Sequence, residues 1–159
     1  NKNKSLPIPR EVKEWLTSPH YAFVADETTI TAYPQEYADD MQAMQRDFNV
    51  LHAGIPIATL KGRDLIPTHA LALSTAFNHN AFARCEVSQL TALNYLRREA
   101  VTLPIDAPRG YVTLTYQGYI LGWVKNLGNR ANNLYPQEWR IRSSHNPDTI
   151  VEAGVKGIL

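Results

Sequence analysis

The side chains best suited to bind a ligand lie between Gly118 and Arg142, in the segment GYILGWVKNLGNRANNLYPQEWRIR. Cations neutralise phosphates, aromatic rings and guanidinium planes stack on unpaired bases, and amides can read base edges or 2′-hydroxyls. A segment that combines these groups is typical of proteins that bind single-stranded or folded RNA. The candidate RNA-binding residues are Lys125, Arg130, Asn132, Asn133, Tyr135, Arg140 and Arg142.

The same segment also has a purely structural interpretation. Asn-rich stretches favour turns, Trp and Tyr fill the cores of small barrels, and arginines are often simply solvated. Trp123 is expected in the core of a strand pair, whereas Trp139 could be core or stacking platform. Gly122, in the middle of the same strand, predicts a bulge or the close approach of another backbone. Spacing alone leaves both interpretations open.

Charge is spread unevenly along the chain, although the net charge is only +1. Residues 1–94 hold eight Lys and Arg against ten Asp and Glu, a balance of −2. Residues 95–142 hold seven against three, a balance of +4. Such asymmetry indicates an anionic partner for the second part, but ordinary variation between two solvated surfaces would give the same pattern.

The residue types and spacings that catalysis or metal binding requires are missing from the sequence. The eight glycines form no glycine-rich loop between a strand and a helix, and the five histidines have no metal-ligand spacing. Cys85 could act as a nucleophile in principle, since Arg84 would favour its thiolate, but Glu86 would oppose it. Cys85 is therefore interpreted as a small apolar residue near a strand or linker, and His69 is a weaker candidate for reactivity. We expect no catalytic residue, metal or cofactor in this chain.

Composition indicates a folded, non-membrane protein. Hydrophobic residues make up 44% and charged residues 19% of the 159 residues, and no stretch approaches the roughly 20 apolar residues of a membrane span. One cysteine permits no intrachain disulfide, which favours the reducing cytoplasm. Because the chain begins at Asn1, it is expected to be a piece of a longer protein.

Hydrophobic periodicity predicts an α+β fold with two small modules, residues 1–84 and 85–159. In the first module we expect helices near 9–16, 35–45 and 68–77 and strands at 21–25, 28–33, 49–52 and 56–61. In the second we expect a helix from an N-cap at Ser88 to residue 100, then strands at 110–116 and 119–125 joined by a Gln117-Gly118 turn. A loop at 126–133 and a strand at 139–142 would follow, with a further edge element possible in 143–159.

The motifs LGWVK, NRANN and LYPQEWR resemble the C-terminal PUA-like motif of the bacterial Nop/Sun rRNA methyltransferases, most closely the RsmF-like 16S rRNA cytosine-5 type. The matching residues are Leu121, Gly122, Lys125, Arg130, Asn133, Tyr135, Pro136 and Arg140. Upstream, GIPIATLKGRDLIPTHALALS resembles the module that precedes the PUA-like domain in these enzymes, through Gly54, Leu60, Lys61, Pro67, His69 and Leu71.

The resemblance implies that the second module is a PUA-like mixed β-barrel with a flanking helix. It implies an accessory region that docks structured RNA, with 16S rRNA the expected partner, for a catalytic domain in cis that lies outside this chain. That domain would bind S-adenosylmethionine and carry the cysteines that methylate carbon 5 of cytosine. A structural module that packs on the catalytic domain with little RNA affinity is the alternative, and an independent enzyme using Cys85 or His69 is a weaker one.

Overall fold

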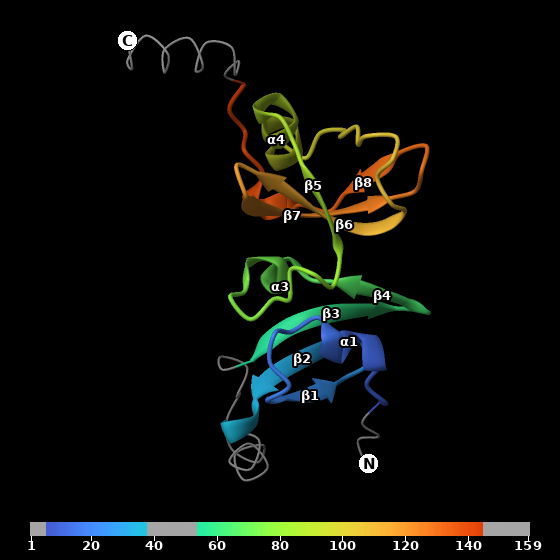
Figure 1. The fold of residues 1–159 in the computed structure, drawn as a ribbon, viewed down its shortest axis with the longest axis vertical. Helices are drawn as coiled ribbons and strands as arrows, with labels where there is room; N and C mark the ends of the chain where they lie inside the picture. The colour runs from blue at the N-terminus through green and yellow to red at the C-terminus, as the bar shows by residue number, and fades with distance from the viewer. Residues whose placement is uncertain (1–5, 38–53, 145–159) are drawn as a thin grey trace, which may run out of the picture. The chain divides into compact units, whose positions relative to one another are not determined.

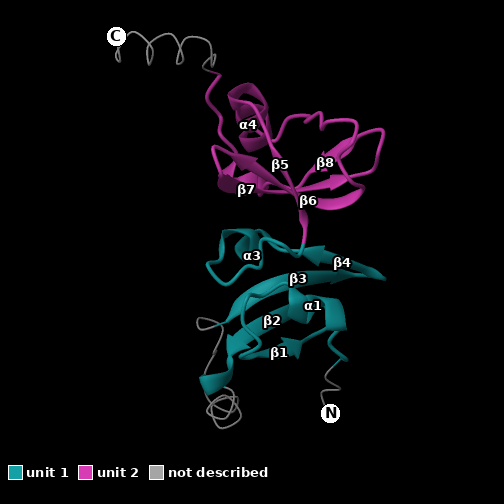
Figure 2. Ribbon diagram, in the orientation of Figure 1, with its two compact units in different colours: residues 1–81 teal, residues 82–159 magenta. Residues whose placement is uncertain are grey.

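The computed structural model describes residues 6–37 and 54–144 of the chain. The chain forms two compact units, Asn1–Ala81 and Phe82–Leu159 (Figure 2). Each unit holds one four-stranded sheet, and the described helices are few and short (Figure 1). The predicted α+β class is therefore confirmed. No helix in the described residues is long and apolar enough to cross a membrane.

Unit 1 is an antiparallel sheet with strands in sequence order, β1-β2-β3-β4. Its elements are α1 (Arg10–Glu14), β1 (Tyr21–Ala25), β2 (Thr29–Pro34), the 3₁₀ turn η1 (Gln35–Tyr37), β3 (Ile55–Lys61), β4 (Asp64–Pro67) and α3 (His69–Leu73). The strands predicted at 21–25, 28–33 and 56–61 are confirmed, whereas β4 was not predicted. The predicted strand 49–52 lies outside the described residues, as does most of the predicted helix 35–45.

Local hydrogen bonds define the ends of the unit 1 elements. The Thr68 hydroxyl accepts a hydrogen bond of 3.1 Å from the Leu71 N–H and so caps the start of α3. Helix α3 ends at Leu73, not at 77 as predicted, because Ser74 is already extended. Beyond α3, Phe77 is buried and forms an isolated antiparallel β-bridge with Leu16. This bridge joins the end of unit 1 to the segment after α1.

Unit 2 contains a mixed sheet in the order β5-β6-β7-β8. Its elements are β5 (Ala83–Glu86), α4 (Gln89–Leu96), β6 (Gly110–Tyr116), β7 (Tyr119–Asn126), β8 (Ala131–Asn133) and the 3₁₀ turn η3 (Gln137–Trp139). Strand β5 runs parallel to β6, with α4 in the connection, and the other pairs are antiparallel. Tyr95 of α4 is fully buried against the sheet. Helix α4 thus fills the position of the predicted flanking helix.

The sheet of unit 2 is open, which corrects the predicted β-barrel. Among the described residues no hydrogen-bonded strand pair joins β5 to β8, so neither sheet closes into a barrel. The two edge strands, β5 and β8, have only four and three residues, so each leaves only a short row of unpaired backbone groups at the edge of the sheet. A single bridge from Val101 to Ala131 lies on the outer side of β8.

The β6–β7 hairpin forms at the predicted positions. Gln117 and Gly118 both have positive φ, 50° and 79°, as a type I′ turn requires. Leu114 pairs with Gly122 but the next residue, Thr115, pairs with Ile120, so Leu121 is the extra residue of a bulge. The bulge predicted from Gly122 is therefore confirmed.

Four predictions for unit 2 need correction. Strand β5 was not predicted, and the predicted loop 126–133 contains β8. The helix capped by Ser88 is confirmed, but it ends at Leu96, before Arg98 turns to a left-handed φ of 62°. The predicted strand 139–142 is wrong: Trp139 belongs to η3, and the Ile141 N–H donates 2.9 Å to the Leu96 carbonyl instead of joining a sheet.

Candidate nucleic-acid interface

A buried core supports the candidate RNA-binding residues. The Tyr95 hydroxyl donates a hydrogen bond of 2.9 Å to the Trp123 carbonyl, and Tyr95 packs with Val112, Leu114 and Val124. Trp123 is only 1% exposed, with the Phe82 ring at 4.6 Å in an edge-on arrangement. The interpretation of Trp123 as a core residue is confirmed.

Lys125 lies in a polar row across three strands. It pairs directly with Tyr111 of β6 and with Asn132 of β8, and directly opposed residues of neighbouring strands share a face of the sheet. The Lys125 Nζ stands 5.1 Å from the centroid of the Tyr111 ring, which is cation–π geometry. Asn132 is exposed. The sheet thus presents an aromatic ring, a cation and an amide side by side.

Asn133 and Tyr135 hold the chain that follows β8. The Asn133 amide nitrogen donates to the carbonyls of Tyr95 and Glu99, at 2.9 and 3.0 Å, while its oxygen accepts from the Tyr135 N–H at 2.9 Å. The Tyr135 ring packs edge-on against Tyr95, with centroids 5.4 Å apart. Both side chains are partly buried, so their contacts fix the loop.

Arg98 reinforces this connection, although the sequence did not single it out. Its guanidinium donates to the carbonyls of Tyr135 and Asn133 and, at 3.3 Å, to the Gln137 side chain. The left-handed φ of Arg98 directs the chain away from α4 at this point. The only sequence signal for Arg98 was its contribution to the positive balance of residues 95–142.

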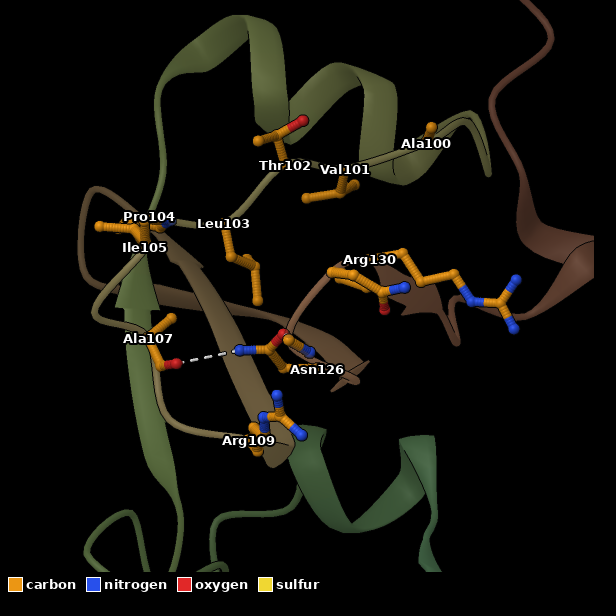
Figure 3. A pocket seen from close by; sticks show the side chains of 13 residues that line it. Ala100, Val101, Thr102, Leu103, Pro104, Ile105, Ala107, Arg109, Asn126 and Arg130 are labelled. Carbon is orange, nitrogen blue, oxygen red and sulfur yellow. Dashed lines mark hydrogen bonds between the residues drawn. The ribbon is translucent and has the colours of Figure 1, made fainter.

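Arg130 lies on the rim of a pocket of about 530 Å³ in unit 2, formed by the chain after α4 and the β7–β8 turn. Asn126 fixes the walls, because its amide donates a 3.0 Å bond to the Ala107 carbonyl (Figure 3). The same amide donates 3.0 Å to the Pro108 carbonyl, and the Asn126 oxygen accepts from the Gly128 N–H. Arg109 also lines the pocket, and Arg130 extends outward, away from it (Figure 3).

Arg140 and Arg142 lie elsewhere, on the exposed segment after η3. They line a second hollow of about 470 Å³ together with Arg97 at the end of α4. The structure therefore divides the predicted basic residues among the polar row of Lys125, the pocket beside Arg130 and this second hollow. Arg97 and Arg109 are further cations that sequence reasoning did not select, since only the folded chain places them beside Arg140 and Arg130.

Four of these arginines form no ion pair within the described part of the chain. Within residues 6–37 and 54–144, no carboxylate forms an ion pair with Arg109, Arg130, Arg140 or Arg142. All four are exposed. Exposed guanidiniums without internal partners can contact phosphates without first breaking an ion pair.

The structure gives little support to catalysis at Cys85. Burial raises the pKa of the Cys85 thiol, and the negative charges of Asp106 and Glu86 raise it further. The protonated thiol is therefore favoured, whereas a nucleophilic cysteine needs a lowered pKa. Among the described residues, no cluster of three His, Cys, Asp or Glu could hold a metal ion.

Comparison with known proteins identifies the second unit. No curated protein matches the chain. Residues 82–141 match the family model described as the methyltransferase RsmF PUA domain, a domain type that is generally RNA-binding. The match runs from just before β5 to Ile141 and includes α4, the β6–β7 hairpin and six of the seven candidate residues. Residues 82–141 of this chain are therefore similar to the PUA domain of the RsmF methyltransferase.

Proposed function

We propose that this chain is the RNA-binding accessory region of an rRNA (cytosine-5) methyltransferase. It docks structured RNA, with 16S rRNA as the partner, and orients it towards a catalytic domain elsewhere in the polypeptide. The observation that carries the proposal is the set of exposed arginines, without acidic partners among the described residues, on a PUA domain. A bacterial cytoplasm would be the setting.

Phosphate contacts provide the affinity in this proposal. Each cation that neutralises a phosphate releases condensed counterions, so RNA binding should weaken steeply as salt rises. The exposed face of Asn132 and the ring of Tyr111 could contact bases beside Lys125. Asn133 and Tyr135 support binding indirectly, since their side chains hold the loop that follows β8.

Methyl transfer is assigned to the catalytic domain, which would bind S-adenosylmethionine. The described strand-to-helix connections of this chain do not fit a cofactor cradle. The β4–α3 connection consists of Thr68 and the β5–α4 connection of Val87 and Ser88, so neither contains the glycines that let a backbone approach a nucleotide closely. Residues 1–84, the predicted first module, would be the pre-PUA module that joins this region to the catalytic domain.

RNA binding across a salt series tests the proposal. The full chain should bind fragments of 16S rRNA, and its affinity should fall as salt rises. Arg130→Ala and Arg140→Ala should each weaken binding and lower the salt slope by about one counterion. Arg63→Ala is the matched control, since Arg63 is an exposed arginine on the β3–β4 turn of unit 1. A folded chain that does not bind RNA at low salt would exclude autonomous docking.

Unit 1 also offers an observation in favour of the structural alternative. Leu6, Val24, Tyr37 and Leu73 are large apolar side chains that are 39–53% exposed. Apolar side chains of this kind can bind another protein domain. In this alternative, unit 1 packs on the catalytic domain and unit 2 adds no RNA affinity. The arginine variants would then bind RNA as the wild type does. Leu73→Ser would weaken the binding of this chain to a separately produced catalytic domain.

A further inference from the structure

The hollow at the C-terminal end of α4 has the composition of a phosphate-binding site. Its lining consists of Arg97, Glu99, Arg140, Ile141, Arg142, Ser143 and Ser144. Three of these residues carry guanidiniums and two carry hydroxyls, against a single carboxylate. Guanidinium groups bind phosphate oxygens through paired N–H donors, and serine hydroxyls donate to the same oxygens.

Two hydrogen bonds hold the arginine-bearing segment against α4. The Ile141 N–H donates 2.9 Å to the Leu96 carbonyl, and Arg97 Nε donates 2.8 Å to the Ser143 carbonyl. The segment after η3 accordingly runs beside α4 in Figure 1. Because Ile141 is anchored to the helix, Arg140 and Arg142 are presented from the positions on either side of it. The hollow is thus built by tertiary contacts and not by a run of basic sequence.

We propose that Arg97, Arg140 and Arg142 bind one RNA backbone phosphodiester in this hollow. The site is separate from the pocket beside Arg130, since the two share no lining residue. Ser143 and Ser144 complete it as hydroxyl donors. This inference rests on the proposed RNA-binding function and adds to it a defined subsite with a role for Arg97.

Double-mutant cycles distinguish a shared phosphate from scattered contacts. Arg140→Ala and Arg142→Ala should each weaken the binding of the full chain to a 16S rRNA fragment by roughly tenfold, the equivalent of ~1.4 kcal/mol. If both arginines contact the same phosphate, the double variant should weaken binding by clearly less than the product of the single effects. Arg130→Ala combined with Arg142→Ala should give the full product, because those residues lie at different sites.

Arg97→Ala should also weaken RNA binding by roughly tenfold. Its urea midpoint serves as the folding control, because Arg97 also supports the segment through Ser143. The Arg140 and Arg142 side chains make no hydrogen bond to other described residues. The Arg140–Arg142 double-mutant cycle therefore still tests the shared phosphate if the Arg97 variant unfolds. Inorganic phosphate, titrated at low concentration while the arginine Nε–H resonances are observed, should shift Arg142 but not Arg130.

Three results would overturn the proposal, and they separate it from the broader function. Wild-type affinity in Arg140→Ala and Arg142→Ala, with weakened binding in Arg130→Ala, would refute the subsite while RNA docking stands. A full product of effects in the Arg140–Arg142 cycle would show two independent contacts. Absence of RNA binding by the folded wild-type chain would remove both the subsite and the proposed function.

Discussion

The side-chain amide of Asn133 donates a hydrogen bond of 2.9 Å to the backbone carbonyl of Tyr95 and so joins β8 to the last turn of α4. A helix leaves its last carbonyls without i+4 partners in the helix, and the Tyr95 carbonyl is one of these. The same amide also donates 3.0 Å to the carbonyl of Glu99, in the chain just beyond α4. The Asn133 side chain therefore connects the strand that carries Asn132 to the helix that leads to Arg97.

Replacing Asn133 with Asp should destabilise unit 2. A carboxylate cannot donate to the Tyr95 and Glu99 carbonyls and would place a negative charge against them. We expect a loss of about 1–3 kcal/mol in the free energy of unfolding, measured by urea denaturation of the full chain. Asn132→Asp is the matched control on the exposed neighbour and should change stability by less than about 0.5 kcal/mol. Equal effects of the two substitutions would contradict the capping role.

Alkaline pH should destabilise unit 2 through Tyr95. Burial raises the pKa of the Tyr95 phenol well above its ordinary value. The folded state therefore keeps this proton after the unfolded state has lost it, so stability is complete below about pH 10 and falls as the pH rises further. Urea midpoints measured between pH 8 and 11 should show this loss in the wild type.

Tyr95→Phe should remove the part of the alkaline loss that Tyr95 contributes. At neutral pH its cost should be only about 1 kcal/mol, because the Trp123 carbonyl still accepts a hydrogen bond from the Leu134 N–H at 3.1 Å. Tyr119→Phe, at an exposed phenol on β7, serves as the control and should leave the pH profile unchanged. An unaltered profile in Tyr95→Phe would show that other groups cause the alkaline transition.

Substitutions at Gln117 and Gly118, the two central residues of the β6–β7 turn, should change the stability of unit 2 in opposite directions. Gln117 adopts a φ of 50°, which Asn tolerates better than Gln, so Gln117→Asn should raise stability by about 0.5–1 kcal/mol. Gly118→Ala should lower stability by about 1 kcal/mol through backbone strain alone, since a Cβ at Gly118 would meet no atom within 4 Å. Urea midpoints that move in the same direction for both variants would be inconsistent with the type I′ assignment.

Cys85 should react slowly with iodoacetamide near neutral pH. Burial and the charge of Asp106 raise the pKa of its thiol, so its alkylation rate should rise towards a plateau at a higher pH than that of a free cysteine. Asp106→Asn should lower the pKa of Cys85 and speed alkylation. Glu27→Gln, on the β1–β2 turn of unit 1, is the control and should have no effect. A fast reaction in the wild type would restore Cys85 as a candidate nucleophile.

Local sequence signals were sufficient for the β6–β7 hairpin but not for its neighbours. Alternating apolar residues and the Gln117-Gly118 turn specify that hairpin without help from the rest of the chain. Strand β8 has three residues, two of them Asn, which the sequence presents as loop formers. Only the ladder to Val124, Lys125 and Asn126 makes it a strand.

The predicted strand at 139–142 was wrong for a related reason. A strand was expected at 139–142, but the N–H of Ile141 donates to the Leu96 carbonyl of α4, 45 residues earlier in the chain. The same distant contact brings Arg97 close to Arg142. Composition identified a basic segment, but the grouping of its arginines depends on tertiary contacts that no local pattern encodes.

The parallel pairing of β5 with β6 also has a consequence for the order of folding. The β6–β7 hairpin can form from adjacent residues across a two-residue turn. Strand β5 can join β6 only after the chain from 87 to 109, including α4, has been folded back, and closing that longer loop costs entropy before any contact compensates it. We therefore expect the β6–β7 hairpin to form before β5 pairs with β6.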